Sequence, residues 1–282
     1  MTKSKCKIGW IIDGFNYELG VMNYKFSSSK YAILFFLTFI FSYTFASNAI
    51  LNDFQQEFGI QIILEDTFES TYENVNYNAV LDTQTLNNYI QNILTAELKK
   101  YPKSYFEKIG LKHIVLCTNL ALYSQKRAAI PDPIKNTLFL SIENIYGSTY
   151  LIHVLHHEMH HISEYAQWQD MFYVWRKWQR KNTKQFTYGT GGQFAYIDGN
   201  EMVDWYKINN PELGFVNLYS TLGPEEDRCE IVSLIMTDAE RPLLLEFMKT
   251  DKYLKRKINL SLKSLSLISG EKMKYWKAKL KP

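Results

Sequence analysis

Five of the chain's six histidines lie in one short segment, from His153 to His161. The segment reads His-Val-Leu-His-His-Glu-Met-His-His and contains one complete His-Glu-x-x-His sequence, formed by His157, Glu158 and His161. Residues four apart share a face of an α-helix, so His157 and His161 can present two imidazole nitrogens to one metal ion. His156 and His160 have the same spacing, but no glutamate follows His156. The pattern therefore indicates a helix whose metal-binding register is set by His157.

The residues around the histidines favour a buried helix over 149–165. Its apolar positions are dense enough for a core helix: Leu151, Ile152, Val154, Leu155, Met159 and Ile162. Gly147 and Ser148 supply a break and a helix N-cap just upstream. Glu158 would then lie beside the metal pair as a general base for a water held by the metal. The alternatives are a core helix with satisfied imidazoles or adventitious metal binding, and neither explains Glu158.

A catalytic zinc site needs a third protein ligand, with the fourth position left for water. One known arrangement supplies it from a histidine six residues further on, after a glycine at the third residue. This chain has Glu164 and Gln167 at those positions, so the third ligand must come from elsewhere. Spacing alone does not choose among the downstream carboxylates, which include Glu164, Asp170, Asp198, Glu201, Asp204 and Glu212.

The stretch 223–236 carries the densest acidic pattern downstream. It begins Gly223-Pro224-Glu225-Glu226-Asp227-Arg228-Cys229-Glu230 and continues as an apolar run. Proline followed by acidic residues is typical of a helix start. Glu226 and Glu230 are one turn apart, so one can bind the metal while the other accepts a hydrogen bond from a ligand imidazole. An acidic first turn that complements the helix dipole explains Glu225 and Asp227 well, but it explains Glu230 poorly.

These segments together resemble a known group of metallopeptidases. After His157-Glu158-Met159-His160-His161, the chain has Gly214-Phe215-Val216-Asn217-Leu218-Tyr219 and then Glu226-Asp227-Arg228-Cys229-Glu230. This order resembles the gluzincin pattern of lethal-factor-like catalytic domains. It is also similar to bacterial exported zinc-binding metallopeptidases, in which Gly-Phe-Val-x-x-Tyr leads into Glu-Asp-(Phe or Arg)-Ala-Glu. The match covers roughly residues 147–237. Cys229 departs from the pattern, because it replaces the usual alanine with a thiol close to the site.

The resemblance implies a role for each matching residue. It implies that one Zn²⁺ ion is bound by His157, His161 and Glu226, and that Glu158 is the catalytic base. It also implies that Tyr219 stabilises the developing oxyanion and that Glu230 supports a ligand imidazole. The implied fold is α+β and zincin-like, with a small mixed sheet, an active-site helix and a helical C-terminal part.

The segment 167–211 separates the histidine helix from the acidic stretch and has an unusual composition. It mixes nine aromatic residues between Trp168 and Tyr196 with five basic ones, and its glycines cluster at Gly189, Gly191 and Gly192. We expect an insertion that frames or covers the cleft. Packing of the aromatics into a secondary hydrophobic cluster is equally compatible with the pattern. A nucleic-acid groove would have a similar mixture, but no recognisable module supports one, and no nucleic acid is expected.

Residues 1–49 predict a signal peptide or an N-terminal anchor. Lys25 and Lys30 precede an apolar run at 32–46, and small residues follow it. The run is short for a transmembrane helix, which needs about twenty residues, although an uncleaved membrane anchor is the alternative. Met22 would be a more ordinary start for a signal peptide, and residues 1–21 would then be an over-extended beginning. The sequence thus predicts a secreted protein or one of the periplasm or cell envelope.

Residues 50–248 are long enough for one zincin-like domain with a sizeable core. Apolar runs predict strands at 60–64, 113–117 and 136–142, and an amphipathic pattern predicts a helix at 83–100. We expect the strand at 136–142 to be an edge strand that pairs with an extended peptide. Cys117 and Cys229 remain after removal of the N-terminal segment, and the sequence does not show whether they pair.

The tail 249–282 is basic, with eleven Lys and Arg against two acidic residues, in a chain whose net charge is only +3. Its leucines would allow weak contact with an anionic surface. Docking on the acidic body of the protein, or a solvated terminal helix, is the simpler alternative.

Together these features predict an exported zinc-dependent metallopeptidase that hydrolyses peptide bonds of a peptide or protein substrate through a zinc-activated water. The alternative is a non-catalytic metal- and peptide-binding protein of zincin fold. The intact Glu158 argues against this alternative, because a site without chemistry has no need of a base. The sequence does not distinguish an endopeptidase from an exopeptidase.

Overall fold

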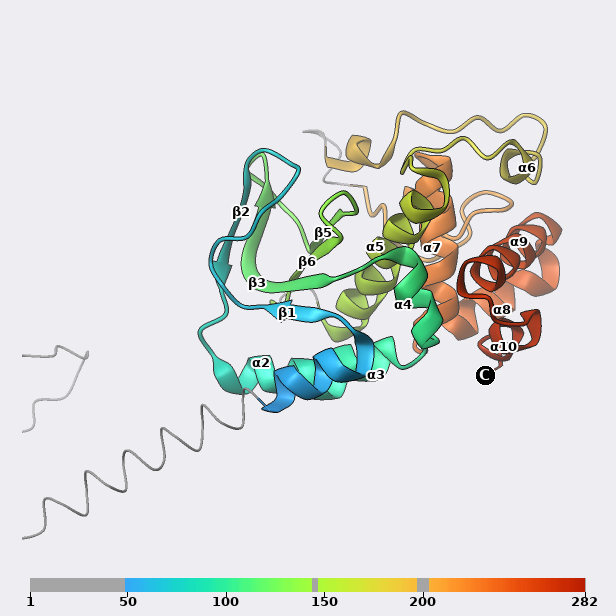
Figure 1. The fold of residues 1–282 in the computed structure, drawn as a ribbon. Coiled ribbons are helices and arrows are strands. Elements are labelled where there is room, and N and C mark those ends of the chain that lie inside the picture. Colours follow the sequence, from blue (N-terminus) through green and yellow to red (C-terminus); the bar gives the residue numbers. More distant parts are fainter. Residues whose placement is uncertain (1–48, 144–146, 197–202, 282) are drawn as a thin grey trace, which may run out of the picture. The chain divides into compact units, whose positions relative to one another are not determined.

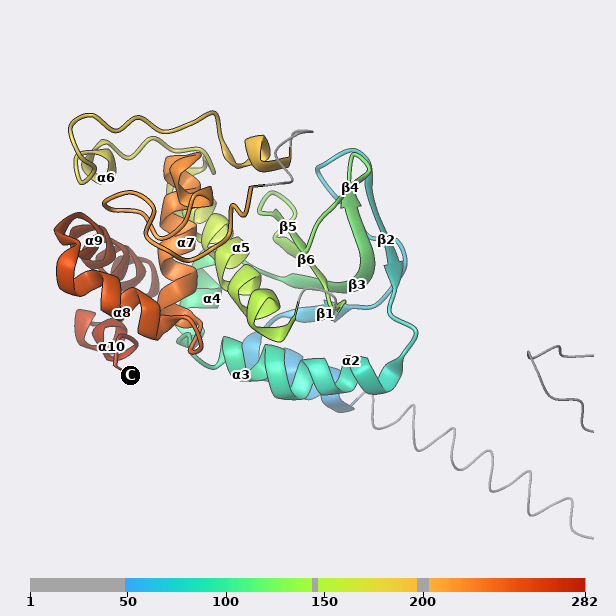
Figure 2. The same cartoon turned by 180° about the vertical axis from the view of Figure 1, so that it is seen from behind.

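The computed structural model describes residues 49–143, 147–196 and 203–281 (Figures 1 and 2). The predicted signal or anchor lies outside these residues. The predicted α+β class is confirmed, because helices surround one small mixed sheet. Within the described ranges, no helix combines the length and the apolar character needed to cross a membrane.

The strands of the described residues form one sheet in the order β1-β3-β6-β5, and β2 and β4 also pair with β3. Their bounds are β1 Gln61–Ile63, β2 Val75–Ala79, β3 His113–Leu122, β4 Gln125–Lys126, β5 Ala129–Asp132 and β6 Thr137–Ser141. β1 and β6 run parallel to β3, whereas β2 and β4 are antiparallel to it and β5 is antiparallel to β6. The three strands predicted from apolar runs are confirmed as β1, β3 and β6.

Both faces of this sheet are buried. Along β3, Ile114 and Leu116 enter the main hydrophobic core, whereas Val115 and Cys117 enter a smaller cluster on the opposite face. Successive side chains of a strand point to opposite faces, so a strand covered on both sides reads as a continuous apolar run. Cys117 is a buried free thiol in the smaller cluster, and Cys229 is a buried free thiol on a helix.

The expectation that residues 136–142 form an edge strand is wrong. β6 lies between β3 and β5, and all of its residues are buried. The edge beside the histidine helix is instead β5, which pairs antiparallel with β6. β5 has only four residues and includes Pro131, which cannot donate to a ladder but is tolerated at an edge. Because β5 is short and contains a proline, its sequence has no strand-like apolar run.

The amphipathic helix predicted at 83–100 is present, with a π-helical turn in its middle. It consists of α2 Thr83–Tyr89, η1 Ile90–Leu94 and α3 Thr95–Leu98, and it is followed by α4 Lys103–Ile109. The carboxylate of Asp82 caps α2 by accepting hydrogen bonds from the backbone N–H groups of Gln84 and Thr85. The apolar face of the helix over 83–98 packs into the main core.

Two long helices, α5 Ser148–Trp168 and α7 Pro224–Met236, lie side by side in both views (Figures 1 and 2). α5 begins directly after Gly147, so Ser148 is its first residue and not its cap, and no side chain caps it. α7 begins at Pro224 as predicted, because a proline at the first helical position lacks only an N–H that would have no helical partner.

The C-terminal part is helical, as predicted, with α8 Arg241–Thr250, α9 Lys252–Ser269 and α10 Met273–Ala278. α9 packs against α7 through apolar residues that are fully buried, among them Leu254, Ile258, Leu262 and Leu265. Basic residues such as Lys255 and Lys263 occupy its exposed face. Contact of this face with an anionic surface stays a prediction.

Candidate metal centre

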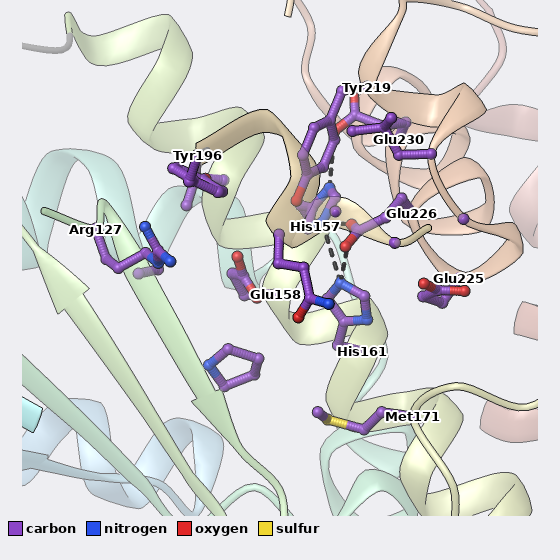
Figure 3. A pocket seen from close by; sticks show the side chains of 18 of the residues that line it. Arg127, His157, Glu158, His161, Met171, Tyr196, Tyr219, Glu225, Glu226 and Glu230 are labelled. Atoms are coloured by element: carbon purple, nitrogen blue, oxygen red, sulfur yellow. Dashed lines mark hydrogen bonds and ion pairs between the residues drawn. The ribbon is translucent and has the colours of Figure 1, made fainter. Parts of the chain in front are cut away.

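The first two predicted ligands lie one helical turn apart on α5. His157 and His161 are 5% and 7% exposed, and their Nε2 atoms face each other at 3.1 Å. Figure 3 shows both rings directed into the same space. The helix geometry predicted from the His-Glu-x-x-His spacing is therefore realised in α5.

The third predicted ligand comes from the first turn of α7. Oε2 of Glu226 lies 3.0 Å from Nε2 of His157 and 3.4 Å from Nε2 of His161 (Figure 3). Glu225, the neighbouring carboxylate, makes no hydrogen bond or ion pair with either imidazole in the described part of the chain. The structure thus brings Glu226, and not Glu225, to the histidine pair.

These three donor atoms fit one zinc ion. Ligands about 2.05 Å from zinc in tetrahedral geometry lie about 3.3 Å from each other. The observed separations of 3.1, 3.0 and 3.4 Å are close to this value. Two imidazole nitrogens and one carboxylate oxygen also form a ligand set known from catalytic zinc sites. Nδ1 of His161 is buried without a hydrogen-bond partner among the described residues, so the ring's polar contacts converge at Nε2.

Two other groups of buried residues also place three donor atoms within 4.8 Å of one another: His157, His161 and Cys229, and His153, His157 and Glu230. Cys229 is fully buried and does not line the cavity described below, and burial raises the pKa of its thiol well above the usual range. A thiol that does not face the cavity is poorly placed to share an ion whose fourth position is open to water. The second group leaves out His161, and its Glu230 carboxylate is already shared among His153, His157 and the Asn217 amide.

Glu230 holds the His157 ring from the side opposite Glu226. Oε1 of Glu230 lies 2.9 Å from Nδ1 of His157, and Oε2 accepts a 2.6 Å hydrogen bond from the Asn217 amide. Nε2 of His153 lies 3.2 Å from the same carboxylate, and its Nδ1 lies 2.6 Å from Glu240. A carboxylate on the second ring nitrogen fixes the orientation and the tautomer of a metal-binding histidine. Glu230 therefore lies where it can support the His157 ring, whereas no sequence pattern pointed to His153 or Glu240 as its neighbours.

The electrostatics of the group favour a cation between the imidazoles and the carboxylate. Burial by itself would raise the pKa of Glu226, but its contacts with His157 and His161 lower it to about 2. Burial would likewise lower the pKa of His157, but Glu226 and Glu230 raise it well above its ordinary value. Glu226 is consequently ionised throughout the physiological range and available as a ligand.

Glu158 presents its carboxylate to the cavity beside the histidines (Figure 3). The side chain is half-buried, and no hydrogen bond or ion pair engages it within the described ranges. Burial raises the pKa of Glu158, and the charges of His157, His161 and Arg127 oppose this rise. An unengaged carboxylate with a raised pKa is suited to accept and return a proton.

Tyr219 lies in the short helix η4 Tyr219–Thr221, and its ring centroid is 5.9 Å from that of His157. Burial raises the pKa of its hydroxyl well above the usual range, so the hydroxyl stays protonated and can donate a hydrogen bond. The backbone of Gly192 runs directly past this hydroxyl. A Cβ atom at Gly192 would lie 2.5 Å from the Tyr219 hydroxyl and 2.1 Å from Oε1 of Glu226. Only glycine therefore leaves Tyr219 and Glu226 in their observed places.

The site opens into a cavity of about 720 Å³. One wall is the segment that includes β5, from Arg127 to Pro131. Another wall is the segment 167–211, which contributes Met171, Phe172, residues 189–193, Tyr196 and Tyr206. This segment includes α6 Arg176–Gln179 and η3 Gly192–Tyr196. It frames the cavity, as expected, and it also packs aromatic side chains against one another, as the alternative proposed.

Asp227, next to the third predicted ligand, anchors this wall. It is fully buried, and its Oδ2 lies 2.7 Å from Nζ of Lys257 on α9. The same oxygen accepts hydrogen bonds from Trp178 Nε1 at 2.7 Å and from the Tyr188 hydroxyl at 2.6 Å. Asp227 thus joins α7 to the segment 167–211 and to α9. A favourable interaction with the helix dipole alone does not account for this residue. The acidic pattern at 223–230 does not indicate these distant partners.

Comparison with known proteins adds little to this description. No family model matches the sequence, and no curated protein matches it. The structure is similar to the crystal structure of a "putative zinc-binding metallo-peptidase" from Bacteroides caccae, with a TM-score of 0.49 and 15% sequence identity. The similarity covers 83% of this chain and 91% of that one.

Proposed function

We propose that this protein is a zinc-dependent metallopeptidase of the gluzincin type. The observation that carries the proposal is the convergence of His157 Nε2, His161 Nε2 and Glu226 Oε2 within 3.0–3.4 Å, beside the unengaged carboxylate of Glu158. A structural metal site has no need for such a carboxylate, whereas hydrolysis requires a base within reach of the attacking water.

Each residue of the centre then has a defined task. His157, His161 and Glu226 would hold one zinc ion, which when bound supplies Lewis-acid polarisation of the scissile carbonyl and a water of lowered pKa. Glu158 accepts the proton of the attacking water and delivers it to the leaving amine. The Tyr219 hydroxyl donates a hydrogen bond to the oxyanion that develops on the carbonyl. Glu230 keeps the His157 ring in place.

The edge strand β5 provides a place for the peptide backbone. Ser141 N–H donates to Ala128 O, so by the alternation of antiparallel ladders Ala129 directs its own N–H and C=O away from β6. The outward carbonyl of Pro131 is already occupied by the Tyr72 hydroxyl at 2.9 Å. Ala129 is therefore the residue of β5 that can add an extended peptide to the sheet next to the metal centre.

The same proposal assigns catalysis to residues 50–248, with 167–211 as an insertion that shapes the cleft. The N-terminal sequence features support export, with a membrane-anchored form as the alternative. A peptide or protein is the substrate that an edge strand beside a hydrolytic centre would accept.

The central experiment combines zinc quantitation with cleavage of a mixed peptide library. We expect about one zinc per chain and cleavage that a chelator abolishes and added zinc restores. Bound zinc without any cleavage would instead indicate a non-catalytic metal- and peptide-binding protein. Absence of bound zinc would refute both.

The choice of the third ligand has its own matched pair of variants. Glu226→Gln should weaken zinc binding strongly, because the amide carries no charge to offer the metal. Glu225→Gln removes the same charge one residue away and should leave zinc binding nearly unchanged. If metal analysis of the two variants gives the reverse order, the ligand assignment is off by one residue.

A further inference from the structure

Arg127 is the only lysine or arginine among the described residues that line the cavity. It lies between β4 and β5, on the wall to which the peptide backbone would add. Figure 3 shows its guanidinium on the side of the cavity opposite Glu225, with Tyr196 beside it. The other acidic residues and histidines of the described lining are Glu225 and the members of the metal centre and its supporting shell.

The guanidinium is held in place without being neutralised. It stacks on the Tyr196 ring at 3.9 Å, and Tyr196 is itself fixed by a 2.7 Å hydrogen bond to the Tyr206 hydroxyl. One nitrogen donates to the Gln125 side chain at 2.8 Å and another to the Lys126 carbonyl at 3.3 Å. Within the described part of the chain, no carboxylate forms an ion pair with it. A positioned but uncompensated guanidinium is ready to receive an anion.

The side chains that line the cavity restrict the kind of anion that can bind to Arg127. Apart from the metal centre, the charged side chains of the described lining are Arg127 and the carboxylates of Glu158 and Glu225, so Arg127 is the side chain there that attracts a negatively charged group. The planar guanidinium matches a carboxylate in shape and can bind it through two parallel hydrogen bonds. A peptide carries carboxylates at its C-terminus and on aspartate and glutamate side chains.

The position along β5 indicates which part of the peptide meets Arg127. Antiparallel pairing is the more stable way to add a strand, and it makes the peptide run opposite to β5. The carboxyl-terminal part of the peptide then lies toward the beginning of β5, where Arg127 precedes Ala129.

We infer that Arg127, stacked on Tyr196, selects substrates by binding a peptide carboxylate on the C-terminal side of the scissile bond. This inference rests on the proposed peptidase function and adds the substrate class to it. The carboxylate is either the peptide's own C-terminus, which would make the enzyme an exopeptidase, or an acidic side chain, which would make it selective for acidic sequences.

The test uses one peptide that the wild-type protein cleaves, prepared in four forms. The C-terminus is either free or amidated, and a residue after the scissile bond is either glutamate or glutamine. The kcat and KM values for each form are measured for the wild type, Arg127→Gln, Arg127→Lys and Lys126→Gln. Lys126 is the matched control, because it carries the same charge on the neighbouring residue but is exposed and outside the cavity lining.

We expect Arg127→Gln to lose roughly ten- to a hundredfold in kcat/KM on the preferred carboxylate form, mainly through KM, because one charged hydrogen-bonded contact is lost. Arg127→Lys should recover part of this loss, and Lys126→Gln should show none. If the effect of Arg127→Gln on kcat/KM requires a free C-terminus, Arg127 binds the C-terminal carboxylate of an exopeptidase substrate. If the effect requires glutamate, Arg127 binds an acidic side chain. An equal loss on all four forms, or a loss confined to kcat, would overturn the inference, because Arg127 would then act on the reacting group or on the fold.

Measurements of peptide binding distinguish a failure of this inference from a failure of the proposed peptidase function. The dissociation constants of the four peptides are measured on Glu158→Gln, with and without the added Arg127→Gln substitution. We expect the same carboxylate preference, and its loss with Arg127. If the wild-type protein cleaves nothing but still binds carboxylate peptides through Arg127, the peptidase assignment fails and the anion site stands. If it cleaves peptides without any carboxylate preference, the reverse holds.

Discussion

The two sides of α5 use histidine in opposite ways. On the core side, His156 is fully buried, with Nε2 2.8 Å from Glu97 and Nδ1 2.9 Å from the Tyr101 hydroxyl. On the cavity side, His157 and His161 direct their Nε2 atoms at each other and at one oxygen of Glu226. The core-side imidazole has its own carboxylate, whereas the two cavity-side Nε2 atoms share one.

This difference separates a structural histidine from the proposed metal ligands on a single helix. Burial lowers the pKa of His156 and outweighs the opposing effect of Glu97, so a neutral ring completes a local hydrogen-bond network. Burial also acts on His161, but the contact with Glu226 outweighs it and raises the pKa. On the cavity side, two imidazole nitrogens lie close to one carboxylate oxygen, and this arrangement favours binding of a cation. Four predictions test this contrast.

The largest expected effect follows from replacing one histidine on each side. His161→Gln should lose bound zinc and all zinc-dependent cleavage, while its melting temperature in chelator stays near that of the wild type. His156→Gln should keep its zinc but melt at a lower temperature, because Glu97 loses its buried partner. Zinc analysis and thermal unfolding of both variants check this. A zinc-free His156→Gln that folds normally would break the comparison.

Glu158→Gln should retain zinc but lose about 10²- to 10⁴-fold in kcat, the usual contribution of a general base. Cleavage rates and metal content are measured together on the same preparation. Glu107→Gln, at an exposed position on α4, serves as the control for loss of a carboxylate. Unchanged cleavage by Glu158→Gln would remove Glu158 from the mechanism.

Glu230→Gln should weaken zinc binding about 10- to 100-fold, as is typical when a carboxylate behind a ligand imidazole is lost. Competition with a chromogenic chelator measures the affinity. Glu246→Gln, exposed on α8, should not change it. An equal affinity in Glu230→Gln would show that His157 needs no support from that side.

The smallest effect belongs to the core side. Tyr101→Phe should reduce the free energy of unfolding by about 1–3 kcal/mol, because Nδ1 of the buried His156 loses its partner. Tyr89→Phe is the matched control, since the Tyr89 hydroxyl is buried without a hydrogen-bond partner among the described residues. Chemical denaturation of the two variants measures the difference. A larger loss for Tyr89→Phe would contradict the assigned network.

The local parts of this structure were predictable and the long-range ones were not. The spacing of His157 and His161 is a property of a single helix, and Pro224 marks the start of α7 by the same kind of local rule. Apolar runs located β1, β3 and β6, because both faces of the sheet are covered. β5 was missed, because a short edge strand containing Pro131 has no strand-like pattern.

Pairing across the chain is what the sequence could not supply. Nothing near Asp227 indicates that Lys257 lies 2.7 Å away, and nothing near His153 indicates Glu240. Glu226 was predicted as the third ligand only through a family resemblance, since spacing left many carboxylates open. Arg127 gave no signal at all, because its importance depends on a cavity formed by β5 and the segment 167–211.

The buried pair of Asp227 and Lys257 has a consequence for the timing of assembly. Removing one partner of such a pair typically costs about 3–5 kcal/mol, so the first turn of α7 depends on a cation that follows it by 30 residues, in α9. A nascent polypeptide emerging from the ribosome has its histidine helix long before it has this counter-ion. The predicted third ligand, Glu226, would therefore reach its place only once α9 has packed against α7.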